Sequence, residues 1–235
     1  MILNTIKSFF SPIPLSVEEV QHPAADYFTI KLTFASDKPF DWHPGTAGMF
    51  TLPHQKHSGS GFRFFSIAAA PSEHSIIIGT RTGKEPSAYK SVLINLKPGD
   101  QVNLRGPIGS FGIKDPHSPA VMIASGVGIT PFRSMALSLL DKPTQTSKLI
   151  HSSHGFHLFA DDFTNVATQN HNFDYLPVES RKEAQEKILS SIHEFGNEAY
   201  YYLSGSSKIV KANQQFLKQN GISVNRIITD IQIGY

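Results

Sequence analysis

Apolar and polar residues alternate in short segments along the first half of the chain. The clearest case is residues 27–34, where apolar residues occupy every second position from Phe28 to Phe34 and polar residues lie between them. A period of two is typical of a strand with one buried face. Turn sequences separate this segment from further predicted strands at residues 49–52, 62–68, 75–81 and 101–105. With one helix over residues 87–96, the pattern predicts a small antiparallel β-barrel or sandwich.

The second half of the chain has a different period. Residues 120–124 are all apolar, as expected of a parallel strand covered on both faces. Further strands are predicted at residues 148–151, 173–178, 199–203 and 227–233, with helices at 131–140, 161–168, 182–195 and 206–219. Alternating strands and helices indicate a doubly wound parallel sheet. Pro116 and Pro119 lie near the junction, so we expect domains at residues 1–114 and 115–235.

Composition narrows the function classes. The 235 residues include 21 Lys and Arg against 19 Asp and Glu, a net charge of +2, which argues against a nucleic-acid-binding protein. The absence of cysteine excludes disulfides, thiolate-bound metals and a cysteine nucleophile. No apolar run reaches the length of a membrane span, and residues 1–10 do not resemble a signal peptide. We therefore expect a cytoplasmic protein, with a monomer favoured. The apolar residues of this first segment are expected to pack on the body of the protein rather than on a membrane surface.

The strongest local motif is Ala124-Ser-Gly-Val-Gly-Ile-Thr-Pro131, which joins an apolar strand to a helix. Gly126 and Gly128 lack Cβ atoms, so the backbone can turn tightly and approach a ligand. Thr130 is expected to cap the helix, and Pro131 suits its first turn. Free amides at such a helix end bind a pyrophosphate, so we interpret the motif as a nucleotide loop rather than a plain tight turn.

Two further segments in the barrel half carry candidate binding residues. In Arg63-Phe-Phe-Ser66, the strand period places Arg63 and Phe65 on one side and Ser66 on the other. An arginine suits a phosphate, an aromatic ring packs on a flat ligand, and a serine hydroxyl can bond a ring nitrogen. The segment Arg105-Gly-Pro-Ile-Gly-Ser-Phe-Gly112 has the glycines of a loop that passes close to a ligand or to the second domain.

At this point the chain resembles the ferredoxin–NADP reductase superfamily. Residues 63–66 resemble its Arg-x-Tyr-Ser flavin motif, and residues 106–111 resemble its Gly-Pro-x-Gly-x-Phe loop. Residues 126–131 resemble its pyridine-nucleotide loop, and residues 202–206 resemble its Cys-Gly-Pro segment. The motifs occur in the family's order and spacing over nearly the whole chain. The resemblance implies an antiparallel β-barrel flavin domain followed by an α/β nucleotide domain.

The resemblance also implies cofactors and site residues. FAD is expected to contact residues 63–67, with Arg63 on its phosphate and Phe65 and Ser66 at its ring, and Phe64 and Ile67 alongside. Ser87 and Arg81 are further candidates, and a contact of Ser87 with the flavin pyrophosphate would favour FAD over FMN. Ser66, Ser204 and Tyr235 are expected next to the reacting rings of the flavin and the nicotinamide. NADH or NADPH is expected to contact residues after the parallel strands: Gly126, Gly128, Thr130, Pro131, Ser152, Ser204 and Gly205.

Several residues depart from the family pattern. Phe65 replaces the usual tyrosine, and Ser204 stands where many members have cysteine beside the nicotinamide. His154 lies near the position of an arginine that binds the 2′-phosphate of NADPH in many members. A neutral histidine binds phosphate less well than arginine, so the choice between NADH and NADPH stays open. Tyr235 is expected either to cover the flavin or to be an ordinary terminal residue.

Histidines at positions 151, 154 and 157 are three residues apart, which raises the question of a metal site. Serine and glycine residues lie between them in a strand-to-loop context, and the next carboxylate in sequence is Asp161. We therefore expect no metal site here.

The sequence thus predicts an enzyme that takes hydride from NAD(P)H onto FAD and passes electrons to a separate acceptor. The acceptor is expected to be a ferredoxin-like or flavodoxin-like protein, an oxygenase component or a small molecule. One alternative is a flavin-binding interaction or regulatory subunit with little turnover of its own. A further alternative is a nucleotide-binding domain without flavin, which would be colourless.

Overall fold

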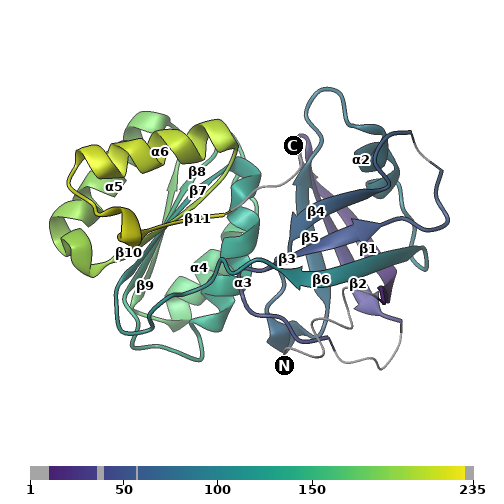
Figure 1. Ribbon diagram of the computed structural model, residues 1–235, viewed down its shortest axis with the longest axis horizontal. Coiled ribbons are helices and arrows are strands. Elements are labelled where there is room, and N and C mark those ends of the chain that lie inside the picture. The colour runs from purple at the N-terminus through teal and green to yellow at the C-terminus, as the bar shows by residue number, and fades with distance from the viewer. Residues whose placement is uncertain (1–10, 36–39, 57, 231–235) are drawn as a thin grey trace. The chain divides into compact units, whose positions relative to one another are not determined.

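The computed structural model describes residues 11–35, 40–56 and 58–230. The apolar segment of residues 1–10 and the candidate Tyr235 lie outside the described residues. The chain forms two compact units that divide between Ser110 and Phe111 (Figure 1). The predicted boundary fell after residue 114. Phe111 belongs to the second unit because its ring lies 5.5 Å from that of Phe132 and 6.1 Å from that of Tyr202.

The first unit is an antiparallel sheet with strand order β4-β3-β6-β1-β2-β5 (Figure 1). The sheet curls into a barrel, and the Ala68 amide, just after β4, donates to the Ile77 carbonyl in β5 at 2.8 Å. A short helix, α2, lies at one end. The elements are β1 (Ile13–Ala24), β2 (Tyr27–Phe34), β3 (Ala47–Thr51), β4 (Phe62–Ser66), β5 (Ile76–Arg81), α2 (Ala88–Leu93) and β6 (Gln101–Ile108).

The barrel core follows from the alternation of apolar residues. In β2, Ile30 and Leu32 are fully buried, and in β6 Val102 and Leu104 are fully buried. The strand β1 was not predicted, because Pro14 interrupts its start. Its alternate residues nevertheless enter the same core, as Ile13, Leu15 and Val17 show.

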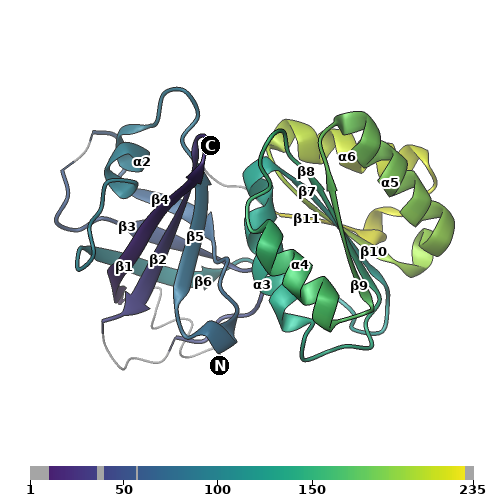
Figure 2. The same ribbon diagram turned by 180° about the vertical axis from the view of Figure 1, so that it is seen from behind.

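The second unit is a five-stranded parallel sheet with strand order β11-β10-β7-β8-β9 (Figure 2). Helices α3 and α4 cover one face, and α5 and α6 cover the other (Figures 1 and 2). The elements are β7 (Ala120–Ser125), α3 (Thr130–Ser138), β8 (Ser147–Ser152), α4 (Ala160–Gln169), β9 (Phe173–Val178), α5 (Arg181–Phe195), β10 (Tyr200–Ser204), α6 (Ser207–Gln219) and β11 (Ile227–Thr229). The predicted fold class is confirmed.

The continuous apolar run of β7 is explained by its central place in this sheet. Residues 120–124 are buried, and β7 is bonded to β10 on one side and β8 on the other. Within the described ranges, no helix combines the length and hydrophobicity that a membrane span requires.

Candidate functional site

The strand order of the second unit changes direction between β7 and β10. The chain runs outward from β7 through β8 to β9, and then returns to the other side of β7 as β10 and β11. In open α/β sheets, ligands bind outside the carboxyl ends of the strands at such a switch point. Here the segments that leave these ends are Gly126–Ile129, after β7, and Gly205, after β10.

These two segments are in close contact. A Cβ atom added to Gly128 would lie 2.6 Å from the backbone Cα and N of Gly205 and 2.7 Å from the carbonyl carbon of Ser204. Gly205 has a φ of +155° and Gly126 a φ of +53°. Gly128 is therefore required for space, and Gly126 and Gly205 for their backbone conformation. The structure thus brings together three of the residues predicted to bind the nucleotide.

The turn after β7 differs from the sequence prediction in one respect. Residues Gly126–Ile129 form a 3-10 turn that continues directly into α3, and the residue before the helix is Ile129. Thr130 is therefore the first helical residue rather than the cap. Its hydroxyl donates to the Val127 carbonyl at 2.7 Å. The expected role of Thr130 is thus changed: it holds the loop together, with Pro131 following it in the first turn of α3.

Ser204 ends β10 and is buried, at 2% exposure. Its hydroxyl donates to the Asp230 carboxylate at 3.1 Å, and the Asp230 amide donates to the Leu203 carbonyl at 2.9 Å. Burial raises the pKa of Asp230 to about 6, and the hydrogen bond from Ser204 opposes part of that effect. The sequence reasoning missed Asp230, since a carboxylate just after a terminal strand has no motif of its own.

Replacing Asp230 with asparagine is expected to change the pH dependence of stability. Because the folded-state pKa is raised, the native state holds this proton more tightly than the unfolded chain, whose value is near 3.8. The free energy of unfolding should therefore fall as pH rises from about 4 to about 7, by up to about 3 kcal/mol. Urea unfolding of Asp230→Asn should lack this fall, whereas Asp174→Asn, at an exposed carboxylate, should keep it. Equal pH slopes for the wild type and Asp230→Asn would contradict the assignment.

In the barrel unit, Arg63 and Phe65 lie on the same side of β4, as predicted. The Arg63 guanidinium lies 5.4 Å from the centre of the Tyr89 ring, and the Phe65 ring lies 6.4 Å from the same ring. Tyr89 is fully buried, and its hydroxyl donates to the Phe50 carbonyl at 3.0 Å. Tyr89 was not predicted as a site residue, because no motif in the sequence marks it.

The other predicted residues of this segment have mixed environments. Ile67 is fully buried in the barrel core, and its amide donates to the Thr46 carbonyl at 2.9 Å. Phe64 packs edge to face on the exposed Phe62, with 5.6 Å between ring centres. Ser66 is half-buried at the end of β4.

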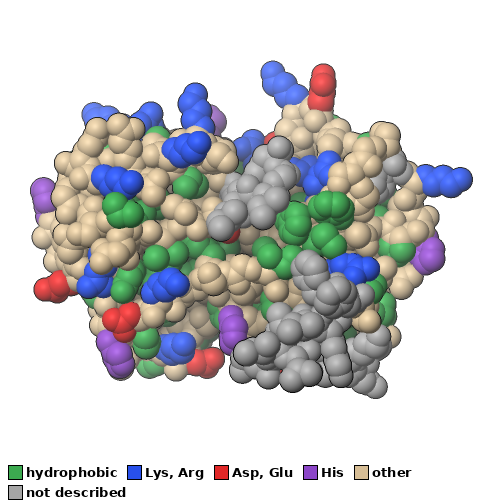
Figure 3. Space-filling model, in the orientation of Figure 1, with side chains coloured by type: hydrophobic (Ala, Val, Ile, Leu, Met, Phe, Trp, Pro, Cys, Tyr) green, Lys and Arg blue, Asp and Glu red, His purple; other side chains and the backbone are tan. Residues whose placement is uncertain are grey.

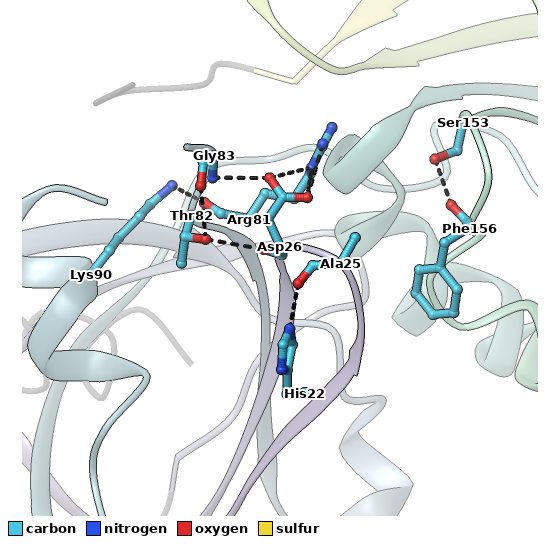
Figure 4. A network of polar contacts seen from close by, with 9 residues as sticks. All are labelled: His22, Ala25, Asp26, Arg81, Thr82, Gly83, Lys90, Ser153 and Phe156. Atoms are coloured by element: carbon cyan, nitrogen blue, oxygen red, sulfur yellow. Dashed lines mark hydrogen bonds and ion pairs between the residues drawn. The ribbon is translucent and has the colours of Figure 1, made fainter. Parts of the chain in front are cut away.

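Arg81 is tied to a turn of the barrel. Its guanidinium donates to both carboxylate oxygens of Asp26, at 3.0 and 3.1 Å, and lies over the Tyr27 ring. The Gly83 amide also donates to Asp26, at 2.9 Å (Figure 4). Burial would raise the pKa of Asp26, but the hydrogen bonds and charge of Arg81 hold it below its usual value.

Lys90, in the first turn of α2, adds a third cation to this end of the barrel. Its ammonium group donates to the Arg81 carbonyl at 2.7 Å (Figure 4). Burial lowers the pKa of Lys90 and the positive charge of Arg63 lowers it further, while the charge of Asp26 raises it and that of Arg81 lowers it again. Ser87 caps the same helix and accepts from the Lys90 amide at 3.4 Å. Arg81 is paired with Asp26, whereas Arg63 and Lys90 repel each other, an arrangement that an anion would stabilise.

Three histidines of the second unit, His151, His154 and His157, lie at the end of β8 and in the segment that follows it. The rings of His151 and His157 are perpendicular, with 4.9 Å between their centres. His154 is exposed and lies 3.6 Å from the Glu179 carboxylate, which accepts from the Gly155 amide at 2.8 Å. In the part of the chain that the structure describes, no group of three or more histidine or acidic side chains is placed to hold a metal ion. Ser152, at the end of β8, is paired in register with Ser125 of β7.

Charges of both signs occur on the visible face of the molecule (Figure 3). Among the described residues, the large hydrophobic side chains that stay exposed are Phe62, Ile209 and Val224. Ile209 lies in the first turn of α6, between Lys208 and Val210. Because these three belong to separate elements, they do not by themselves define an apolar patch.

Comparison with known proteins shows which family of domains the second unit resembles. Residues 122–214 match the oxidoreductase NAD-binding domain family. A component of the Na(+)-translocating NADH-quinone reductase of Actinobacillus pleuropneumoniae is 28% identical over 196 residues, which cover 72% of this chain and 48% of that protein. The chain thus spans about half the length of the curated relatives it matches.

Solved structures share the whole two-unit fold. Ferredoxin-NADP+ reductase from Plasmodium falciparum aligns with a TM-score of 0.77 at 17% identity and covers 94% of this chain and 96% of that one. The flavohem-like FAD/NAD-binding domain of nitric oxide dioxygenase from Vibrio cholerae aligns with a TM-score of 0.75 at 20% identity, covering 93% and 97%.

Residues 122–214 of the second unit thus match the oxidoreductase NAD-binding domain family, and the fold of the chain is the one that these solved reductases share. These findings confirm the resemblance found in the motifs: the chain has the fold of the ferredoxin–NADP reductase superfamily.

Proposed function

We propose that this protein is an NAD(P)H-dependent FAD oxidoreductase that passes electrons to a separate acceptor. The observation that carries the proposal is the contact of Gly128 with Gly205 at the switch point of an NAD-binding domain. This contact supports the interpretation of residues 126–131 as a nucleotide loop, which sequence spacing alone could not distinguish from a plain tight turn. Solved proteins with this fold are named for FAD and for NAD or NADP+, which supports the same cofactors here.

The barrel residues suit the phosphates of FAD. Arg63, Arg81 and Lys90 place three cations at one end of the barrel, and the charges of the two arginines lower the pKa of Lys90. A pyrophosphate would relieve that repulsion, and the arginine guanidinium would bind it through paired donors. Arg63 is the better placed of the two arginines, because Arg81 is already paired with Asp26. Ser87 is expected to contact the same phosphates.

The residues near the reacting rings would bind and orient rather than transfer protons. A bound flavin supplies the redox chemistry by accepting a hydride. Phe65 would pack on the ring, and the Ser66 hydroxyl would hold a ring nitrogen. Ser204, already oriented by Asp230, would hold the nicotinamide. Orientation of the two bound groups would therefore be the main contribution of these residues.

We expect the coenzyme to be NADH rather than NADPH. The Glu179 carboxylate accepts a hydrogen bond from the Gly155 amide in the loop after β8. In a Rossmann fold, this loop region holds the adenosine ribose of the coenzyme. A carboxylate there would repel a 2′-phosphate, and Glu179→Gln should raise the kcat/KM for NADPH relative to NADH by about tenfold. Glu186→Gln, an exposed carboxylate further along α5, is the matched control and should leave the ratio unchanged. A wild-type preference for NADPH would contradict the assignment.

The acceptor is the least constrained part of the proposal. The matched relatives are named for quinone reduction and the solved structures for ferredoxin or nitric oxide chemistry, which are different acceptors. A protein such as a ferredoxin or an oxygenase component, or a small molecule, would therefore complete the cycle.

Steady-state turnover tests the proposed function. The chain loaded with FAD should oxidise NADH with ferricyanide as the electron acceptor, at a rate proportional to bound flavin. Ser66→Ala should slow this reaction while FAD stays bound. A protein that binds FAD but turns over no faster than free FAD would instead be a flavin-binding interaction or regulatory subunit, and the proposal would be wrong.

A further inference from the structure

His151 is a buried histidine that the proposed reaction does not use. It lies in β8, in register with Ala124 of β7, and its side chain is fully buried. Its Nε2 lies 3.2 Å from the Gly126 carbonyl oxygen, and its Nδ1 lies 3.3 Å from the Tyr175 hydroxyl. The imidazole thus connects the turn after β7 with β9 through the strand between them.

The partners of His151 fix its protonation. A carbonyl oxygen only accepts, so Nε2 carries the hydrogen and donates to Gly126. Burial and, to a smaller extent, the nearby His157 lower the pKa of His151 to about 3, although the hydrogen bond to Gly126 opposes part of that effect, so the ring is neutral. Nδ1 therefore accepts, and Tyr175 donates to it, because burial raises the pKa of the Tyr175 hydroxyl and keeps it protonated.

This bond has a counterpart on the next residue of the turn. The Val127 carbonyl accepts from the Thr130 hydroxyl at 2.7 Å, as the Gly126 carbonyl accepts from His151. Two successive carbonyl groups are thus held by the protein. A turn whose carbonyls are fixed in this way also has fixed amide directions, and amides at the start of a helix are the groups that bind a pyrophosphate.

We propose that His151 is a positioning residue for the dinucleotide: its Nε2–H holds the Gly126 carbonyl so that the turn is preorganised to bind a pyrophosphate. This inference rests on the proposed function, because it takes the turn to be the nucleotide site. The role belongs to the donor at Nε2 and not to the charge of the ring. His151 acts through the backbone and does not touch the ligand.

Two polar variants separate this role from simple packing. The amide nitrogen of glutamine can take the place of Nε2, whereas that of asparagine lies nearer the place of Nδ1. His151→Gln should therefore keep the affinity for ADP-ribose and the KM for NADH within about twofold of the wild type. His151→Asn should weaken both by about tenfold, since the Gly126 carbonyl loses its donor. Its affinity for AMP, which has no pyrophosphate, should change less.

Leu149→Ala is the matched control, because Leu149 is also fully buried in β8, two residues earlier. It should lower the melting temperature and leave the affinity for ADP-ribose unchanged. Calorimetry with ADP-ribose and AMP on the FAD-loaded protein gives the affinities, and NADH oxidation gives KM and kcat. Equal affinities for ADP-ribose in His151→Gln and His151→Asn would overturn the inference, and so would an equal loss in Leu149→Ala. A wild-type protein that binds neither ADP-ribose nor NADH would instead overturn the proposed function.

Discussion

Gly128→Ala is expected to abolish detectable NADH oxidation and to lower the free energy of unfolding by about 3 kcal/mol. The added Cβ would lie 2.6 Å from two backbone atoms of Gly205, and a backbone cannot move away as a flexible side chain can. The turns after β7 and β10 would have to separate. That movement would displace the amides of the turn after β7 and the side chain of Ser204 at the end of β10. Binding of the pyrophosphate and orientation of the nicotinamide would therefore both be lost.

The matched control for this variant is Gly61→Ala. A Cβ atom added to Gly61 would have no other atom within 4 Å, and neither Gly61 nor Gly128 has a positive φ. The two substitutions therefore differ in the space available and not in backbone strain. Chemical denaturation and NADH oxidation should show Gly61→Ala close to wild type. Near-wild-type turnover in Gly128→Ala would mean that the two turns do not form the nucleotide site.

The second large effect is expected at Arg63. Arg63→Ala should weaken FAD binding by about 10- to 100-fold, because hydrogen bonds between a guanidinium and a phosphate are among the strongest polar contacts. The guanidinium is already restrained, since it donates to the Phe62 carbonyl at 2.9 Å and lies beside Tyr89. Less conformational entropy is therefore lost when a phosphate binds.

FAD content after purification and a fluorescence titration of FAD would measure this effect. Arg63→Lys keeps the charge without the paired donors, so its affinity for FAD should lie between those of Arg63→Ala and the wild type. Lys31→Ala removes a cation of the same unit that is paired with Glu18, and should leave FAD binding unchanged. Full flavin occupancy in Arg63→Ala would refute the role assigned to Arg63.

The fold could be predicted from the sequence where burial leaves a simple pattern. Residues 173–178 were predicted as a strand with the bounds that the structure has, and the apolar run of residues 120–124 identified the central strand β7. The strand β1 was missed because its prolines and the Glu18–Glu19 pair interrupt the alternation. In the structure, the register shifts between Val17 and Glu19, which accommodates that interruption.

The site could be predicted only where neighbours in sequence are also neighbours in space. The motifs identified Gly126, Gly128 and Arg63, but not the partners that the fold brings to them. Asp230 reaches Ser204 because β11 and β10 are adjacent, and His151 reaches Gly126 because β8 lies beside β7. Strand order creates these pairs, and no local spacing encodes them.

The central claim is that a nicotinamide reduces a flavin held by this chain, and an anaerobic visible spectrum tests it most directly. The purified protein loaded with FAD should be yellow, and one equivalent of NADH should bleach its flavin absorbance rapidly. Bleaching by dithionite but not by NADH or NADPH, or a protein that stays colourless after incubation with FAD, would contradict the account.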